Sequence, residues 1–354
     1  MQEGAVGFST GLIYIPGTYS NSDEVVDLAK AAAAYQGVYA SHMRDEGAQI
    51  IDAINEAARV GQEAGMPVQL SHFKIDTPRL WGMSEQTLAL VEDYRRKGVD
   101  VVVDQYPYDH SSTNLDITLP SWALADGPDA VRERLTTPET RQKIAAEMER
   151  RLLDLGHKDY SYAIVATYRP NREYEGKNIA EVNTLRGKES TVANQIDTIL
   201  EMMLAGGAQM IYHSMGDVDV LRIMRYPNTA FASDGGIRIF GEGMPHPRAY
   251  GTNARVLAEY VRKRNVLTLE DAVRRMTSLP ARTFGFQDRG IIRAGAAADL
   301  LIFDPARVQD KSTYTQPHQY TEGFDYVVVN GVVMVDEGKL TDSRGGKVLR
   351  HEVH

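Results

Sequence analysis

The stretch GVYASHMRDEGAQIIDAINEAARVGQEAGMPVQLSHFK, residues 37–74, decides the fold of this chain. It contains two apolar runs that each end in Ser-His, VYASH and VQLSH, and apolar residues recur at helical spacing between them. Gly65 and Pro67 predict the end of that helix. A strand, a helix and a strand in about thirty residues form a βαβ unit, whose two strands are parallel and adjacent.

The two histidines that close these runs, His42 and His72, are therefore predicted to lie at the carboxyl ends of neighbouring strands. In parallel α/β architectures that end of the sheet carries the chemistry. Two imidazoles there indicate a pair of metal ligands, and a carboxylate is the expected third member of the site. Asp234 in AFASDGG, which follows another short apolar run, is the candidate.

Strands and helices alternate strictly in the first part of the chain. Helices are predicted from about Ser22 to Tyr35, with Ser22 as the N-cap, and from Ser84 to Lys97, before the strand VDVVVDQYPY. Strict alternation is typical of a parallel α/β fold, and we predict a TIM-like (β/α)8 barrel rather than an open sheet. Neither nucleotide-binding glycine motif follows any strand, which argues against a nucleotide site.

The alternation of strands and helices breaks from about residue 109 to about residue 207. There a polar loop leads to a charged helix, a short strand and a helix after Ser190. Connections this long in a compact domain are usually functional, so we expect an inserted segment over the mouth of the site. The alternation is expected to resume with the strand AQMIYHS, a helix near Asp217 and the strand in TAFASDG.

The last part of the chain changes to an alternating β pattern, with Asn330-Gly331 as a type I′ hairpin turn. We therefore expect a partial barrel over residues 1–285, which includes the inserted segment, and a small β-sandwich-like appendage over residues 286–354.

Length and composition restrict the class of protein. The 354 residues suffice for a large core and a small second domain. The net charge of −9 argues against nucleic acid or an anionic membrane as a partner. No apolar run reaches the ~18 residues of a membrane helix and no signal peptide is evident, so we expect a cytoplasmic protein. The absence of cysteine excludes disulfides and thiolate metal ligands within this chain.

Several segments together resemble the D-aminoacylase (N-acyl-D-amino-acid deacylase) family of the metal-dependent amidohydrolase superfamily. They run along the whole chain in the family's order: GAVGFSTGLIY, YASHMRDEG, VQLSHFK, DQYPY, YHSMGDVDVLRIMRYP, ASDGG, MPHPRAYGT, MTSLPARTFGFQDRGIIRAGAAADLLIFDP and VVVNGVVMVDEGKLT. The resemblance enters the family near its fourth barrel strand. The family's first β segment, His-x-His strand and cysteine ligand have no match here, so we expect a missing N-terminal segment or a partner chain to complete the barrel.

The resemblance implies a function. It is zinc-dependent hydrolysis of the amide bond of N-acyl-D-amino acids, small molecules that yield a carboxylate and a free D-amino acid. His42 and His72 would hold Zn²⁺, and Asp234 would be the general base. Lys74, on the same strand face as His72, would pair with the substrate carboxylate together with Arg248.

Further residues are expected around the substrate. Side chains alternate along a strand, so only one of Tyr106 and Tyr108 should point inward. Ser112, with its neighbour His110, would meet the acyl or side-chain group, and His213 ends a strand-like run that could line the pocket. The apolar loop STNLDITLPSWAL favours a substrate with a neutral side chain. The remaining histidines, His157 among them, are expected on the surface.

Two other functions stay open on the sequence alone. A cyclic-amide hydrolase of the dihydroorotase or hydantoinase kind is the nearest alternative, and an assay with both substrate types would separate the two. The other is an inactive fragment, or a chain that requires a partner, because the His-x-His pair and the cysteine ligand are absent from this sequence.

Overall fold

The computed structural model describes residues 1–351, and its centre is a parallel sheet with the strand order β1-β2-β3-β4-β8. The bounds of its strands are β1 Gly7–Gly11, β2 Val38–His42, β3 Val68–Leu70, β4 Val101–Gln105 and β8 Thr229–Phe231. Tyr39 of β2 pairs with Val68 of β3, which in turn pairs with Val101 of β4, all in parallel register. The predicted βαβ unit and the parallel α/β class are therefore confirmed.

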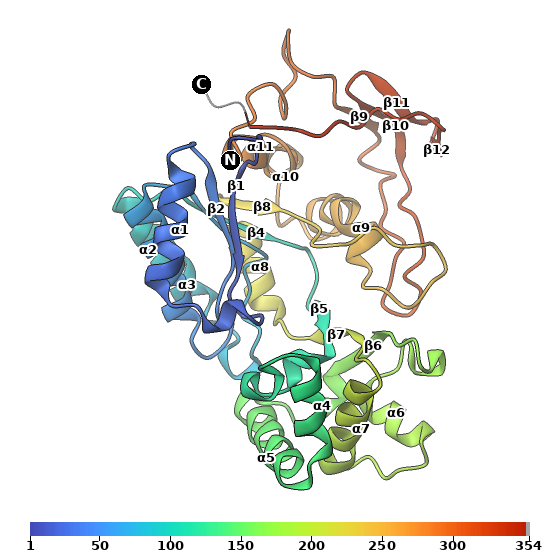
Figure 1. Ribbon diagram of the computed structural model, residues 1–354. Coiled ribbons are helices and arrows are strands. Elements are labelled where there is room, and N and C mark those ends of the chain that lie inside the picture. Colours follow the sequence, from blue (N-terminus) through green and yellow to red (C-terminus); the bar gives the residue numbers. More distant parts are fainter. Residues whose placement is uncertain (352–354) are drawn as a thin grey trace.

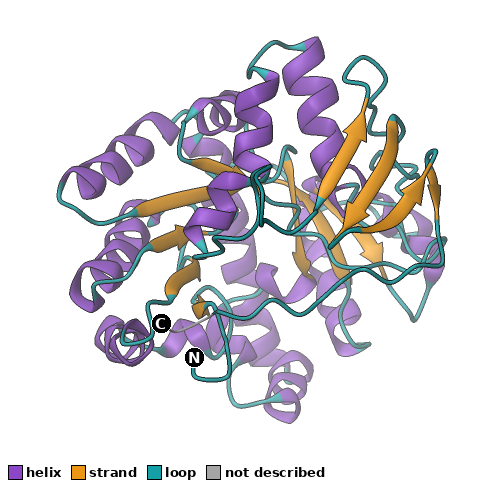
Figure 2. Ribbon diagram, turned by 90° about the horizontal axis from the view of Figure 1, so that it is seen from above, coloured by secondary structure: helices purple, strands orange, loops and turns teal. Residues whose placement is uncertain are grey.

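Helices cover one face of this sheet, and Figure 2 shows them lying outside the strands. Their bounds are α1 Ser22–Ala33, α2 Ile50–Ala64, α3 Ser84–Arg96 and α8 Asp217–Arg225. Val25 of α1, Ile54 of α2 and Val91 of α3 pack in one buried core with Leu70 and Val103 of the sheet. This one-sided cover is the arrangement of a barrel wall, with helices outside and the site at the strand ends.

Two helix boundaries test the predicted capping. Gly65 ends α2 with a φ of 68°, in the left-handed region that glycine adopts without strain, as the sequence predicted. The predicted N-cap of α1 was wrong by one residue. Asn21 caps this helix, because its side chain accepts from the Glu24 N–H at 2.9 Å and Ser22 is already helical.

Between β4 and α8 the chain forms a separate lobe, residues 110–213, which we call the insertion; it appears in green below the parallel sheet in Figure 1. Its strands, in the order β5-β7-β6, are antiparallel. The bounds are β5 His110–Asn114, α4 Pro128–Thr136, α5 Pro138–Leu155, β6 Ala163–Thr167, α6 Ile179–Leu185, α7 Val192–Leu204 and β7 Gln209–His213. Leu115, Ile144, Met148, Ile199 and Met210 belong to a core of its own.

The strand in AQMIYHS exists, but its predicted place in the barrel was wrong. It is β7, and it pairs antiparallel with both β5 and β6, where His213 lies opposite His110. An apolar strand pattern predicts burial and not the partner strand, so the sequence could not assign it to a sheet. The predicted helix near Asp217 is α8, and the predicted strand in TAFASDG is β8, which pairs with β4 of the parallel sheet.

The C-terminal part adds helices and then a small antiparallel sheet with the order β12-β11-β10-β9. The bounds are α9 Arg248–Arg255, the π-helical turn Val256–Lys263, α10 Leu269–Met276, α11 Ser278–Thr283, β9 Leu300–Phe303, β10 Phe324–Val329, β11 Val332–Asp336 and β12 Lys339–Leu340. Asn330 and Gly331 have φ values of 49° and 81°, as the predicted type I′ turn requires. Up to residue 351 this appendage is one sheet, and not two facing sheets.

The two ends of the described chain lie side by side, near the labels N and C in Figure 1. The His351 N–H donates to the Gly4 carbonyl at 2.9 Å. No helix within residues 1–351 combines the length and the apolar composition that crossing a membrane requires.

Candidate active site

The carboxyl ends of the parallel strands bring the candidate residues to one edge of the sheet. His42 is the last residue of β2, and His72 follows the end of β3 by two residues. Tyr106 comes directly after β4, and Asp234 follows the end of β8 by three residues. This common edge is where parallel α/β proteins place their sites.

A histidine–carboxylate cluster lies at this edge. The His42 and His72 rings are 4.3 Å apart, and Glu46, from the loop after β2, joins them. One donor atom from each of the three residues lies within 4.8 Å of the others. Glu46 Oε1 is 3.0 Å from His72 Nδ1, and Glu46 Oε2 is 3.7 Å from His42 Nε2.

This cluster fits a metal ion. Burial lowers the pKa of His42 to about 3, so that its imidazole is neutral near pH 7. His42 Nε2 is buried and has no hydrogen-bond partner among residues 1–351. A neutral imidazole with a free lone pair, a second imidazole and a carboxylate form a donor set that suits zinc.

Lys74 lies against the same cluster. Its Nζ donates to Glu46 Oε1 at 2.6 Å and lies 2.8 Å from His72 Nδ1, and its side chain is only 4% exposed. Burial disfavours the ammonium, but the Glu46 carboxylate outweighs burial and raises the pKa of Lys74 above its ordinary value. Burial also disfavours the charged form of Glu46, yet Lys74, as the largest opposing influence, together with the two histidines lowers the pKa of its carboxyl. Lys74 thus neutralises Glu46.

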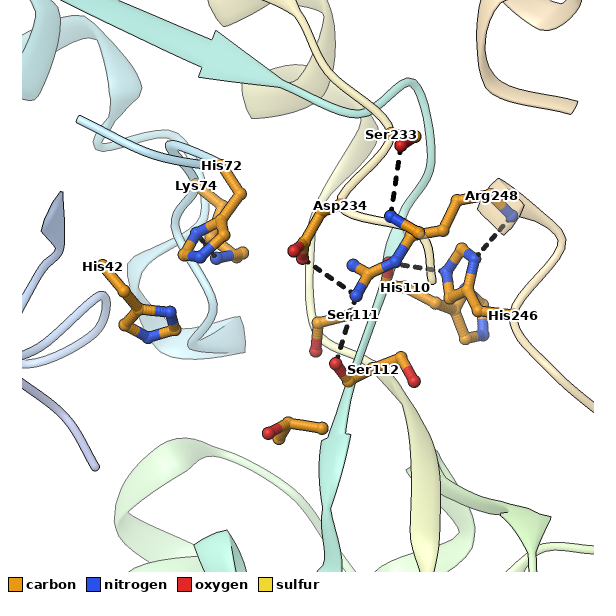
Figure 3. Close-up of polar contacts among 12 residues, drawn as sticks. His42, His72, Lys74, His110, Ser111, Ser112, Ser233, Asp234, His246 and Arg248 are labelled. Carbon is orange, nitrogen blue, oxygen red and sulfur yellow. Dashed lines mark hydrogen bonds and ion pairs between the residues drawn. The ribbon is translucent and has the colours of Figure 1, made fainter. Parts of the chain in front are cut away.

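Arg248, the first residue of α9, connects the remaining candidates. Its Nη2 forms an ion pair with Asp234 Oδ2 at 2.8 Å and donates to the Ser112 carbonyl at 3.2 Å. Its guanidinium lies 4.6 Å from the centre of the Tyr106 ring. Figure 3 shows the Asp234 carboxylate between Arg248 on one side and His72 with Lys74 on the other.

Two hydrogen-bond donors of this group are unused. Tyr106 Oη and Arg248 Nη1 are buried and have no partner in the described part of the chain. Burial raises the pKa of Tyr106 to about 12, so that its hydroxyl stays protonated and can donate. Buried donors without partners are costly, and a bound carboxylate would satisfy both.

A cavity of about 1490 Å³ connects these groups. Among the residues that line it are His42, Glu46, His72, Lys74, Tyr106, Ser112, Asp234 and Arg248. Part of its wall comes from the insertion, with Ile117, Leu119, His157, Tyr162 and Tyr212. The expected surface position of His157 was therefore wrong, and its ring stacks on Tyr162 at 3.6 Å.

Other expected residues lie elsewhere or use their polar atoms within the protein. Tyr108 does not line the cavity and packs its buried ring under Arg255. His213 also lies outside the cavity lining, with its side chain 46% exposed. The Ser112 hydroxyl donates to the Met210 carbonyl at 2.7 Å, and His110 pairs with its neighbour Asp109.

Sequence reasoning missed two residues of the site, Glu46 and Tyr14. The only signal for Glu46 is its position four residues after His42, and on a loop this spacing has no fixed geometry. Tyr14 lies in the loop after β1, packs on the His42 ring at 4.8 Å and shares a 3.2 Å hydrogen bond with the Thr113 hydroxyl. Tyr14 thus connects the histidine–carboxylate cluster to the insertion.

The fold and the site define a class of protein, the α/β proteins whose parallel sheet carries a cluster of candidate metal ligands at the carboxyl ends of its strands. The chain belongs to the amidohydrolase family, whose sequence pattern it matches over residues 20–335.

Named relatives agree with this family. The chain is 35% identical to N-acyl-D-glutamate deacylase and 34% identical to D-aminoacylase, both from Alcaligenes xylosoxydans xylosoxydans, over 99% of its length. It covers 62% of each of these two proteins, so it spans about three fifths of their length. N-acyl-D-glutamate deacylase from Bordetella bronchiseptica, solved with zinc and a phosphonate mimic of the tetrahedral intermediate, superposes with a TM-score of 0.78. That structure is 34% identical and matches 98% of this chain and 63% of its own.

Proposed function

We propose that the protein to which this chain belongs is a zinc-dependent hydrolase of N-acyl-D-amino acids. One observation carries the proposal: a cavity joins a His-Glu-His cluster to two unused donors suited to a carboxylate, Tyr106 Oη and Arg248 Nη1. The amide and the carboxylate of an N-acyl amino acid are a few bonds apart and match these two features. The names of the relatives supply the D configuration and the linear amide.

The metal would be held by His42, His72 and Glu46. When bound, zinc supplies a Lewis acid that polarises the amide carbonyl and makes water more acidic. Lys74 would balance the charge of Glu46. With Arg248, it would be the second cation near the substrate carboxylate.

The remaining residues would position the substrate and move the proton. Arg248 and Tyr106 would bind the carboxylate, and this orients the scissile amide toward the histidine cluster. Asp234 would take the proton of the attacking water and deliver it to the leaving amine. Its ion pair with Arg248, at 2.8 Å, would fix the Asp234 carboxylate beside the substrate.

The wall of the cavity bears on which amino acid is cleaved. Ile117, Leu119, Tyr162 and Tyr212 are apolar or aromatic, and this favours a neutral side chain on the substrate. Four arginines other than Arg248 also line the cavity, but each already donates to a group of the protein: Arg44 to Glu56, Arg132 to the Leu204 carbonyl, Arg150 to Asp154 and Arg151 to the Leu119 carbonyl. We therefore expect N-acetyl derivatives of neutral D-amino acids to be preferred over those of D-Asp and D-Glu.

The test is an assay of the zinc-loaded protein with N-acetyl-D-methionine, its L enantiomer, N-acetyl-D-glutamate and a hydantoin. The expected result is faster release of free amino acid from the D-methionine derivative than from the D-glutamate derivative, with none from the L enantiomer and no hydrolysis of the hydantoin. Hydrolysis of the hydantoin with none of the linear amides would instead favour the cyclic-amide alternative. Asp234→Asn should remove turnover and keep zinc, whereas loss of zinc with the activity would make Asp234 a ligand.

The proposal concerns the whole protein, because the chain matches only part of the length of its relatives. A further segment or a partner chain that completes the barrel belongs to the same proposal, and the intact mass of the native protein with any bound partner tests it. We also propose a cytoplasmic location, which cell fractionation tests.

A further inference from the structure

The backbone at His72 adopts an unusual conformation. Its φ is +39°, in the left-handed region that residues other than glycine seldom occupy. The direction of the imidazole depends on this backbone as well as on the contacts of its ring with Glu46 and Lys74, because the paired residues of β3 end at Leu70, two residues before His72. Some other contact must therefore hold the residue in place.

Asp104, near the carboxyl end of β4, makes that contact. Its Oδ1 accepts from the His72 backbone N–H at 2.6 Å, and its backbone carbonyl accepts from the Phe73 N–H at 2.8 Å. Its other carboxylate oxygen, Oδ2, accepts from Gln69 Nε2 at 2.6 Å. One residue of β4 thus bonds to β3 at Gln69 and to the segment that follows β3 at His72 and Phe73.

We infer that Asp104 is a positioning residue that presents the His72 imidazole to the metal. The inference rests on the proposed function in that it takes His72 as a ligand. A charged acceptor makes a stronger hydrogen bond to a backbone N–H than a neutral acceptor does, and this stabilises a conformation that the chain otherwise avoids. The Asp104 carboxylate is bonded to Gln69 and to the backbone of His72, and would itself remain outside the coordination of the metal.

Asp104→Ala and Asp104→Asn separate this role from general stability. Asp104→Ala removes the acceptor, and zinc affinity should fall about 10- to 100-fold, as for other residues that orient a ligand. Asp104→Asn keeps an oxygen for the His72 N–H. Its new amide group would face Gln69, whose own amide can turn because its buried Oε1 has no partner within residues 1–351. Asp104→Asn should therefore retain most of the wild-type zinc affinity.

Asp219→Ala is the matched control. Asp219 is 1% exposed and accepts from the backbone N–H groups of Gly82 at 2.7 Å and Ser84 at 3.0 Å, away from the cluster. Its loss should lower stability and leave zinc affinity unchanged. The affinities are measured by competition with a chromophoric chelator. If Asp104→Ala does not fold, Asp104→Glu takes its place, because it keeps the charge and displaces the acceptor, so zinc affinity must again fall.

A second measurement needs no metal. Labelling with ¹⁵N-histidine gives backbone amide signals for the nine histidines, and His72→Gln identifies that of His72. The short bond to a side-chain oxygen at position 104 should shift this proton downfield in the wild type and, to a lesser extent, in Asp104→Asn, but not in Asp104→Ala. If the protein binds no zinc but shows this pattern of amide shifts, the proposed function is wrong. The role of Asp104 in positioning His72 is then still supported. Equal zinc affinity in the wild type and Asp104→Ala, or an unchanged His72 amide signal, overturns the inference.

Discussion

Single residues show how the chemistry of the site depends on pairing. Lys74 neutralises Glu46, and Arg248 holds Asp234, so these two carboxylates each have their own cation. The positions of His42 and His72 could be predicted, because strand ends in a βαβ unit have a fixed geometry. The partner of Lys74 could not, because Glu46 lies on a loop whose path depends on tertiary contacts.

The two tyrosines after β4 give a prediction at this scale. Tyr106→Phe removes a hydroxyl that faces the cavity, and a hydrogen bond to a charged group is worth about 1.5–3 kcal/mol. KM should therefore rise about 10- to 100-fold with kcat little changed. Tyr108→Phe is the control, since this residue does not line the cavity and its steady-state kinetics should match the wild type. Equal effects of the two variants would remove Tyr106 from the carboxylate site.

The lowered pKa of His42 predicts how stability depends on pH. Burial holds this pKa at about 3, so between pH 6.5 and 3 the unfolded chain takes up a proton that the folded chain does not. The free energy of unfolding should therefore fall as the pH falls below 6.5, by about 2 kcal/mol at pH 5 from this residue. Urea unfolding of the metal-free protein at pH 7 and pH 5 measures the loss. His42→Gln should lose about 2 kcal/mol less than the wild type, and identical losses would contradict the assignment.

At the scale of elements, patterns close in the sequence predicted well and patterns that needed a distant partner did not. Helix α2, the strands around it and the Asn330-Gly331 hairpin were all predicted from local spacing and turn residues. Strand β7 was placed in the wrong sheet, because its pattern is the same in either sheet. The cap of α1 was displaced by one residue, since Asn21 and Ser22 are both good caps.

The contact of α2 with β3 supplies a prediction for an element. Gly61 is buried in α2, and an added Cβ would overlap Val68 Cγ2 and lie 2.9 Å from the Met66 carbonyl oxygen. Gly61→Ala, which stabilises most helices, should here lower the free energy of unfolding by about 1 kcal/mol or more through overpacking. Chemical denaturation measures this, with the exposed neighbour Gln62→Ala as the control. A more stable Gly61→Ala protein would mean that the helix moves away from the sheet without cost.

At the scale of the whole molecule, the chain has separate cores in the parallel sheet and in the insertion. Hydrogen bonds that join the two parts include Tyr14 to Thr113 and Tyr19 to Ser121, and Trp81 bonds to Ser214, the residue directly after the insertion. The sequence predicted that a segment is inserted over the site. It did not predict that this segment folds around a sheet of its own, because that sheet pairs strands from the two ends of the insertion.

Two cores with few connections should unfold separately. Trp122 lies in the insertion, and Trp81 is the other of the two tryptophans. In a Trp81→Phe variant, fluorescence therefore reports on the insertion, whereas far-ultraviolet circular dichroism reports on all helices. The smaller core buries less surface, so the Trp122 transition should have its midpoint at lower urea than the main loss of helix. Superimposable curves would show that the two parts unfold as one unit.

The cavity is built from two parts of the chain, and selectivity for a substrate and the reacting groups therefore depend on different parts. His42, His72 and Asp234 stand on the parallel sheet, whereas Ile117, Tyr162 and Tyr212 come from a lobe with its own core. Side chains of that lobe can change while the reacting groups keep their positions, because Arg248 contacts the lobe through the Ser112 backbone carbonyl, which a substitution leaves in place. A lineage with this architecture can therefore acquire new substrates by changing one module while the ancestral reaction is inherited intact.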